Sequence, residues 1–304
     1  MTTGTDRAVV GDVRKSETAR TIAELVACGS MEINAHRADD ARELAALLPA
    51  GTPVYVTHLP RQSPADSLRA LVAARAAGLE PVPHVAARRV ASRDELKSFL
   101  ERAVREAGVR KLLLIGGEVP EPSGPYGDAL AVLRDGLLAD CGIREVGLAG
   151  YPEGHPSIAS DALERALDSK LELAEAQGLG SYIVTQFSFA PQRIVEYCTG
   201  LARRMPSLPI FVGLAGPTEP LALLRYAQRC GVSASLRALR AQGIGAVRLV
   251  THTDPGDQLA AMARYCTAHA RCNVVGVHLF SFGGAVKTAA WMNRAIAARS
   301  AEAP

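Results

Sequence analysis

Short apolar runs alternate with longer helical patterns along most of the chain. The run at 111–115 is continuously apolar after its first residue, which is typical of a strand covered on both faces in a parallel sheet. Seven other runs rich in aliphatic or β-branched residues have similar lengths: 30–33, 53–57, 81–85, 145–149, 182–186, 208–213 and 274–280. About eight strands, each followed by a helix, predict an α/β fold of the (β/α)8 TIM barrel class, with an open doubly wound sheet as the competing topology.

Helix signals lie between these runs. The segment 63–66 combines an N-cap serine, a proline at the first helical position and an acid in the first turn, and Ser92 and Glu95 have the spacing of a capping box. Other helical segments are predicted at 17–27, 39–48, 157–177, 217–230, 232–241 and 255–270. The barrel therefore carries an extra N-terminal helix and an elaborated connection between its seventh and eighth strands.

Composition adds limits to this picture. The chain is 48% hydrophobic and 21% charged with a net charge of +3, without a break in composition that would mark a linker, so we expect one barrel domain over 1–304. The near-neutral charge argues against nucleic acid as a partner, and the pairs at 88–89 and 203–204 are interpreted as solvated arginines. The apolar runs are too short to span a bilayer and the polar start lacks the apolar core of a signal peptide. We expect a cytoplasmic protein without a membrane partner.

The six cysteines are dispersed, with no C-x-x-C pair and no histidine at zinc-finger spacing. We therefore expect no metal site. In a reducing compartment these side chains are expected to be packed free thiols, and the placement of Cys266 and Cys272 on or near one helix does not change that expectation.

Polar residues gather where the predicted strands end, and a barrel places its chemistry at the carboxyl ends of its strands. Glu32 lies inside an apolar run, where a carboxyl group is costly unless it is paired or neutral, so it is the first catalytic candidate. The alternative for Glu32 is an acid at a strand edge, paired with a lysine or arginine. The segment 150–156 contains Pro152 and Pro156, which stiffen it, and it either presents Tyr151 and His155 to a ligand or only covers the barrel mouth.

Taken in order, these motifs resemble those of the 5,10-methylenetetrahydrofolate reductases. The resemblance rests on the glutamate of the first strand, P-H ending the third, G-E-V-P after the fourth, Y-P-E-G-H-P after the fifth and T-Q-F-S-F after the sixth. It covers about residues 30–298 and only the catalytic barrel of such enzymes. It implies FAD as cofactor, NADH or NADPH as co-substrate and a folate as substrate.

The resemblance also implies residue roles. The flavin would lie across the barrel mouth, held by residues at the strand ends, which are Thr57, His84, Ile115, Gly116, Gly117, Tyr126, Gly127, Gly150, Tyr151 and His155. Glu164 and Lys170 match only loosely the acid and lysine that such enzymes turn toward the ribose and phosphates, and solvated surface positions are the alternative for both. For His84, Thr57 and Tyr126 taken singly, a satisfied core or rim residue is the alternative.

The catalytic roles follow from the same resemblance. Glu32 would be the general acid that helps to open the imidazolidine ring of methylenetetrahydrofolate. Glu118 would favour the cationic form of the substrate, Gln186 would bind a pterin edge, and Phe280 is placed with these three in the substrate pocket. Nicotinamide and folate would use one face in turn, which predicts ping-pong kinetics. Such enzymes are often homo-oligomers, and the resemblance extends that expectation to this chain.

The chain also departs from the family pattern. Residues 33–36 lack the aromatic and proline residues that commonly follow the first-strand glutamate, Gly116-Gly117-Glu118 replaces R-G-D, and no phenylalanine follows the seventh strand at 215–220. Three alternatives are therefore kept: a flavin-free folate-binding barrel, a hydrolase or lyase using Glu32 and Glu118, and a family member acting mainly in the oxidative direction on 5-methyltetrahydrofolate.

Overall fold

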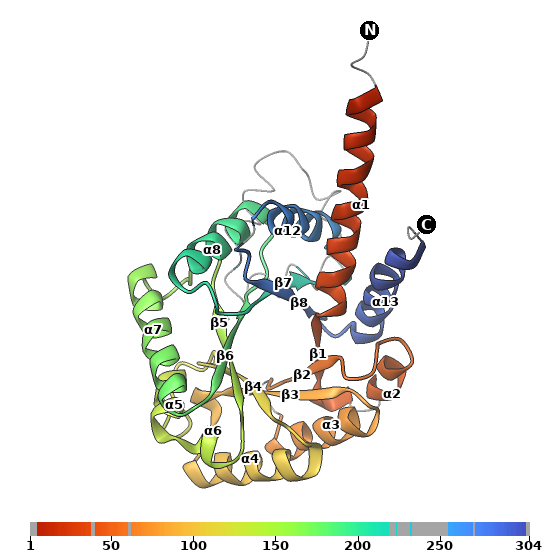
Figure 1. Ribbon diagram of the computed structural model, residues 1–304. Helices are drawn as coiled ribbons and strands as arrows, with labels where there is room; N and C mark the ends of the chain where they lie inside the picture. The colour runs from red at the N-terminus through yellow and green to blue at the C-terminus, as the bar shows by residue number, and fades with distance from the viewer. Residues whose placement is uncertain are drawn as a thin grey trace.

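The computed structural model describes residues 5–37, 40–59, 62–218, 223, 232, 255–269 and 271–301. Eight parallel strands form a closed barrel in sequence order, with β8 pairing back to β1 (Figure 1). The strands are β1 (Ser30–Asn34), β2 (Pro53–Thr57), β3 (Glu80–Ala86), β4 (Lys111–Ile115), β5 (Glu145–Gly150), β6 (Gly180–Thr185), β7 (Ile210–Ala215) and β8 (Val274–Phe280). Closure confirms the predicted barrel and rejects the open doubly wound sheet.

Helices surround this barrel on the outside (Figure 1). They are α1 (Thr5–Ala27), η1 (Ala35–Arg37), α2 (Asp40–Ala45), α3 (Pro64–Ala76), η2 (Ala87–Arg89), α4 (Arg93–Ala107), α5 (Ala129–Asp135), α6 (Leu137–Asp140), α7 (Ser160–Ala176), α8 (Pro191–Arg204), α12 (Gly256–Ala268) and α13 (Ala285–Ala301). In the described part of the chain, none of them combines the length and the apolar character that a membrane span requires.

Several helix boundaries differ from the sequence prediction. The N-terminal helix begins at Thr5, well before the predicted start at residue 17, and it lies against α12 and α13. Helix α7 begins at Ser160 and not at residue 157, because the preceding loop continues to a bridge between His155 and Ile158. The predicted segment 255–270 is α12, whereas the segments predicted as helical at 217–230 and 232–241 lie almost entirely outside the described residues.

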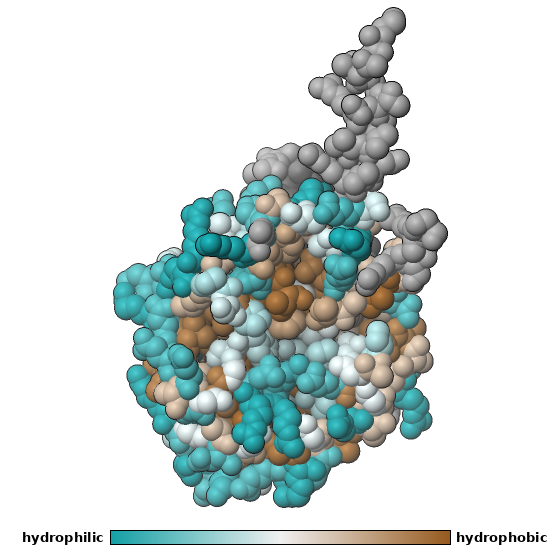
Figure 2. All heavy atoms as spheres, in the orientation of Figure 1, coloured by the Kyte–Doolittle hydropathy of each residue, from teal (hydrophilic) through white to brown (hydrophobic). Residues whose placement is uncertain are grey.

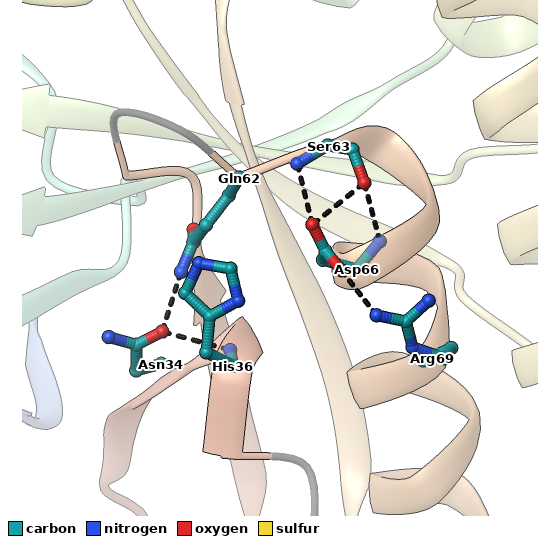
Figure 3. Close-up of polar contacts among 6 residues, drawn as sticks. All are labelled: Asn34, His36, Gln62, Ser63, Asp66 and Arg69. Atoms are coloured by element: carbon teal, nitrogen blue, oxygen red, sulfur yellow. Dashed lines mark hydrogen bonds and ion pairs between the residues drawn. The ribbon is translucent and has the colours of Figure 1, made fainter.

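The two predicted helix caps have different geometries. Before α3, the Ser63 hydroxyl accepts a hydrogen bond from the Asp66 amide, and the Asp66 carboxylate accepts one from the Ser63 amide, which completes a capping box (Figure 3). Before α4, Ser92 caps the amide of Glu95, but the Glu95 carboxylate accepts from Ala91, one residue too early for a capping box. The second prediction is therefore correct for the N-cap and wrong for the reciprocal bond.

The strands divide their side chains between two cores. Outward-facing residues such as Met31 and Val54 pack with the helices, while Tyr55, Val82, Leu113, Tyr182 and Val184 form a separate cluster inside the barrel. Successive residues of a strand point to opposite faces, so the inward set on β1 includes Ser30 and Glu32. The fold thus directs the Glu32 carboxyl group toward the barrel interior.

The amino-terminal end of the barrel contains a cavity of about 420 Å³, which is lined among others by Pro53, Phe211 and Val275. Val275 is one of the exposed large hydrophobic residues of the described chain, at 42% exposure. Figure 2 shows hydrophobic residues gathered near the centre of the visible face, in the region of β7 and β8. Tyr55 and Tyr182 also line this cavity and separate it from the polar groups nearer the other end.

Candidate active site

Glu32 lies between two buried histidines inside the barrel. Its Oε1 atom is 3.7 Å from Nε2 of His84 on β3 and 3.6 Å from Nε2 of His278 on β8. The Glu32 side chain is 13% exposed. Within the described part of the chain, neither histidine Nε2 atom has a hydrogen-bond partner, although both are buried. A shift of a few tenths of an ångström would bring the carboxyl group into hydrogen-bonding distance of either ring.

The residues behind His278 fix its orientation. Its Nδ1 atom lies 2.8 Å from the Ser30 hydroxyl oxygen, and when Ser30 donates this bond the ring proton is on Nε2, facing Glu32. The edge of the Tyr55 ring packs against His278, with the centroids 4.6 Å apart. Tyr55 donates a 3.0 Å hydrogen bond to the hydroxyl of Tyr182. Burial raises the pKa of both tyrosines, so these phenols stay protonated and act as a rigid support.

The electrostatic state of His84 follows from its burial. Burial lowers its pKa to about 4, the Glu32 carboxylate opposes this shift, and His278 and His58 add to it. His84 is therefore a neutral imidazole at neutral pH, with one ring nitrogen able to donate and the other able to accept. A carboxyl group next to two imidazoles can exchange a proton with them without charging the whole cluster.

A polar rim lies above this cluster at the carboxyl ends of the strands. The register pairs Asn34 with Thr57, and Gly150 with Thr185. The Thr57 hydroxyl donates to the carbonyl of Ile33 over 3.2 Å, and the backbone amide of Gln186 donates to the carbonyl of Gly150 over 2.8 Å. These contacts place the ends of β1, β2, β5 and β6 on one rim, as the sequence predicted.

Glycines open part of this rim. A Cβ atom added at Gly116 or Gly127 would have no neighbour within 4 Å, so both positions border open space. Gly117 has φ +97°, a conformation that favours glycine. Gly150 differs, because a Cβ there would lie 2.7 Å from the Tyr197 hydroxyl oxygen. Gly116 and Gly127 therefore allow close approach of a ligand, whereas Gly117 is required by its backbone conformation and Gly150 by packing.

The loop after β5 presents an aromatic pair. The Tyr151 and His155 rings meet edge to face with centroids 5.3 Å apart, and Nδ1 of His155 accepts a hydrogen bond from the Ser157 amide. Burial lowers the pKa of His155 and raises that of Tyr151. The pair is ordered by its own loop, and it adds a neutral polar edge to the rim.

Comparison with known proteins identifies the family. A sequence model of methylenetetrahydrofolate reductase matches residues 44–237. The chain belongs to the methylenetetrahydrofolate reductase family. The match includes His84, Gln186 and the loop after β5, but it begins after β1, so the place of Glu32 in this reductase-family site comes from the barrel geometry.

Two solved structures are similar to this chain at low sequence identity. A protein from Clostridium thermocellum, described as binding two copies of 5-methyl-5,6,7,8-tetrahydrofolic acid, is 10% identical with a TM-score of 0.53, covering 86% of this chain and 93% of that one. Dihydropteroate synthase from Thermus thermophilus is 13% identical with a TM-score of 0.43, covering 88% and 92%. The structure from Clostridium thermocellum therefore has the same fold as this chain.

Three residues that the family resemblance assigned to the flavin lie apart from the rim contacts. Tyr126 is 3% exposed in the outer core, and its hydroxyl donates a 2.6 Å hydrogen bond to Asp135. Glu164 is on the outer surface of α7, 3.3 Å from the Arg204 guanidinium. Lys170 is half-buried on the same helix, where burial lowers its pKa and Asp128 opposes that shift.

The loop that carries Glu118 is fixed by an arginine that the sequence interpretation placed in solvent. Arg88 donates through its guanidinium to the carbonyls of Val119, Pro120 and Gly127, and through its amide to that of Gly116. Glu118 itself is exposed. The prediction of a solvated pair is therefore wrong for Arg88. Arg203 and Arg204 are both exposed, as predicted, and Arg204 also pairs with Asp168 over 2.8 Å.

An aromatic group lines the β6 and β8 side of the rim. The Phe280 ring lies 5.0 Å from that of His278 and is stacked on Phe282 at 6.1 Å, and Phe187 packs against both phenylalanines. Phe282 has φ +48°, which is unusual for a residue with a bulky side chain. This group provides aromatic surface even though no phenylalanine follows the seventh strand.

Ser30 and Tyr55 were not among the predicted site residues, and His278 was expected in the eighth strand but was given no role. All three contribute directly to the cluster around Glu32. Their signal was the period of two along β1, β2 and β8, because each stands an even number of residues from a position already assigned to the rim or the interior.

Proposed function

We propose that this chain interconverts 5,10-methylenetetrahydrofolate and 5-methyltetrahydrofolate, with FAD as cofactor and NADH or NADPH as co-substrate. The observation that carries the proposal is the Glu32 carboxyl group between His84 and His278, beneath the polar rim of a reductase-family barrel. The family supports a folate as substrate. The flavin, the nicotinamide and the reaction itself are our proposal.

The rim residues fit the ring end of a flavin. The open space at Gly116 and Gly127 allows a planar ring to approach the backbone. Thr57 and the Tyr151–His155 pair would hold its polar edges. Lys170, half-buried on α7 and apart from these rim contacts, would be the cation for the phosphates, although burial lowers its pKa. When bound, the flavin supplies the carrier that passes hydride between nicotinamide and folate.

The proton chemistry belongs to the chain's own residues. Glu32 would donate a proton to a ring nitrogen of methylenetetrahydrofolate as the imidazolidine ring opens. His278, oriented by Ser30, and neutral His84 lie within 3.7 Å of the carboxyl oxygen and would hold it in position. Gln186 would bind the pterin edge through its amide, and Glu118 would favour a cationic substrate from the loop that Arg88 fixes.

The test separates the two half-reactions. In the Glu32→Gln variant, FAD bound to the protein should still be bleached by NADH at nearly the wild-type rate. The return of flavin colour with methylenetetrahydrofolate should slow by roughly 10²–10⁴-fold, the usual contribution of a general acid. Glu145→Gln, an exposed strand glutamate at the amino-terminal end of β5, is the matched control and should change neither rate. Equal slowing of both half-reactions by Glu32→Gln would reject the proton-donor role.

A flavin-free folate-binding barrel is the second candidate. Two observations favour it. Glu164, which the resemblance assigns to the flavin ribose, is paired with Arg204, and residues 116–118 lack the arginine of the family motif. A colourless protein that ignores added FAD but binds 5-methyltetrahydrofolate would establish this alternative.

A further inference from the structure

Two cysteine side chains meet at the base of β8. Cys266 is in the last turn of α12, and Cys272 is in the loop that leads from this helix into β8. Their Sγ atoms are 2.9 Å apart, less than 1 Å beyond the length of a disulfide bond, which is about 2.05 Å. Both side chains are half-buried, so they remain open to small molecules. The pair lies at the amino-terminal end of the strand, away from the rim.

The local fold holds the two sulfur atoms together. After α12 the chain turns back on itself, with the Cys272 amide donating to the carbonyl of His269 over 2.9 Å. The next residue, Asn273, donates through its side-chain amide to the carbonyls of Leu208 and Met205. This double anchor fixes the start of β8 and with it the position of Cys272 opposite Cys266.

The two thiols differ in their acidity. The pKa of Cys272 lies below its ordinary value, first because of the hydrogen bond between the two thiols, with further contributions from the Val274 amide and His269. Burial opposes this shift. The pKa of Cys266 is raised, first by the same hydrogen bond and then by burial. Because the thiolate is the reactive form, Cys272 has the character of an attacking thiol and Cys266 that of a resolving thiol.

We propose that Cys266 and Cys272 form a redox-active dithiol that reacts with small disulfides and closes to an intramolecular disulfide. The Cys272 thiolate attacks one sulfur of the small disulfide, and the first small thiolate leaves. Cys266 then loses its proton and attacks the Cys272 sulfur, which releases the second small thiolate. The protein dithiol is oxidised by two electrons, and the small disulfide is reduced to two thiols.

The other described cysteines provide the contrast. Cys198 is nearby on α8 but fully buried, and burial raises its pKa to about 12. Cys141 is half-buried, and burial raises its pKa as well. Cys28 is exposed and offers a simple surface thiol. If exposure alone decided which thiol reacts with a small disulfide, Cys28 would react first. If a neighbouring thiol and a lowered pKa decide it, Cys272 reacts first.

The test uses the full chain, reduced and then mixed with oxidised glutathione. After quenching with an alkylating reagent, intact mass and peptide mapping should show the loss of two hydrogen atoms and a link between Cys266 and Cys272. The Cys266→Ser variant should instead keep a stable glutathione adduct on Cys272, and Cys272→Ser should form no internal link. Cys28→Ser and Cys198→Ser are matched controls that should still close the disulfide.

The peptide map of the unaltered protein decides the matter even if a variant fails to fold. Glutathione adducts confined to Cys28, or a link from either thiol to Cys198, would overturn the proposal. The measurement is independent of any folate or flavin activity, so its outcome does not depend on the function proposed above.

Discussion

Replacing His84 should change how the stability of the protein depends on pH. In the folded state burial lowers the pKa of His84 to about 4 from the ordinary 6.5. Between these two values the unfolded chain binds a proton on this histidine and the folded chain does not. The free energy of unfolding should therefore fall as the pH falls through this window, and the loss should be complete near the lower value.

The size of the effect follows from the width of the window. Each pH unit within it removes up to about 1.4 kcal/mol from the free energy of unfolding, so the complete effect is about 3 kcal/mol and about 2 kcal/mol is lost by pH ~5. His84 is 9% exposed, so solvent screening reduces this estimate little. The His84→Gln variant lacks the titrating group. Between pH ~7 and ~5 its free energy of unfolding should therefore fall by about 2 kcal/mol less than that of the wild type.

Urea unfolding at pH ~7 and ~5, followed by the fluorescence of the single tryptophan, Trp291, measures the difference directly. Trp291 is buried on α13, so its emission should change on unfolding. His36→Gln is the matched control, because His36 is exposed and its replacement leaves the buried His84 in place. Equal loss of stability on acidification in the wild type and in His84→Gln would refute the reasoning.

Two further changes test the supports of the fold and the site. Ser63→Ala removes the N-cap of α3 and should lower the free energy of unfolding by about 1 kcal/mol in urea, whereas Ser157→Ala, at an exposed loop position, should have little effect. Arg88→Ala leaves three loop carbonyls without their donor, so limited proteolysis should cut between Gly116 and Gly127 faster than in the wild type, and FAD binding should weaken. An unchanged cleavage pattern would show that the loop does not depend on Arg88.

The sequence was sufficient for the fold because its signals are local. Continuous apolar runs such as Lys111–Ile115 and stops such as Gly108, which has φ +65°, set element type and order without knowledge of distant contacts. Helix boundaries were predicted less accurately where the preceding loop forms backbone pairs of its own, as between His155 and Ile158 before α7. The chirality of parallel strand connections then left few topologies to consider.

The site was only partly predictable, because several of its contacts join residues far apart in the chain. Nothing near Glu32 in the sequence indicates that His278 will face it, and only the period of two along β8 points inward. The assignment of Tyr126 to the ligand remains a prediction from its motif position, whereas packing places its hydroxyl against Asp135. Cys266 and Cys272 are free thiols, as expected, but their spacing in the sequence did not reveal that their Sγ atoms lie 2.9 Å apart.

Formation of 5-methyltetrahydrofolate is the most direct test of the proposed role of this barrel. The protein, supplied with FAD, 5,10-methylenetetrahydrofolate and either NADH or NADPH without oxygen, should produce it in proportion to the nicotinamide consumed, as measured by mass spectrometry. Consumption of neither nicotinamide and of no methylenetetrahydrofolate by a folded protein would contradict the account.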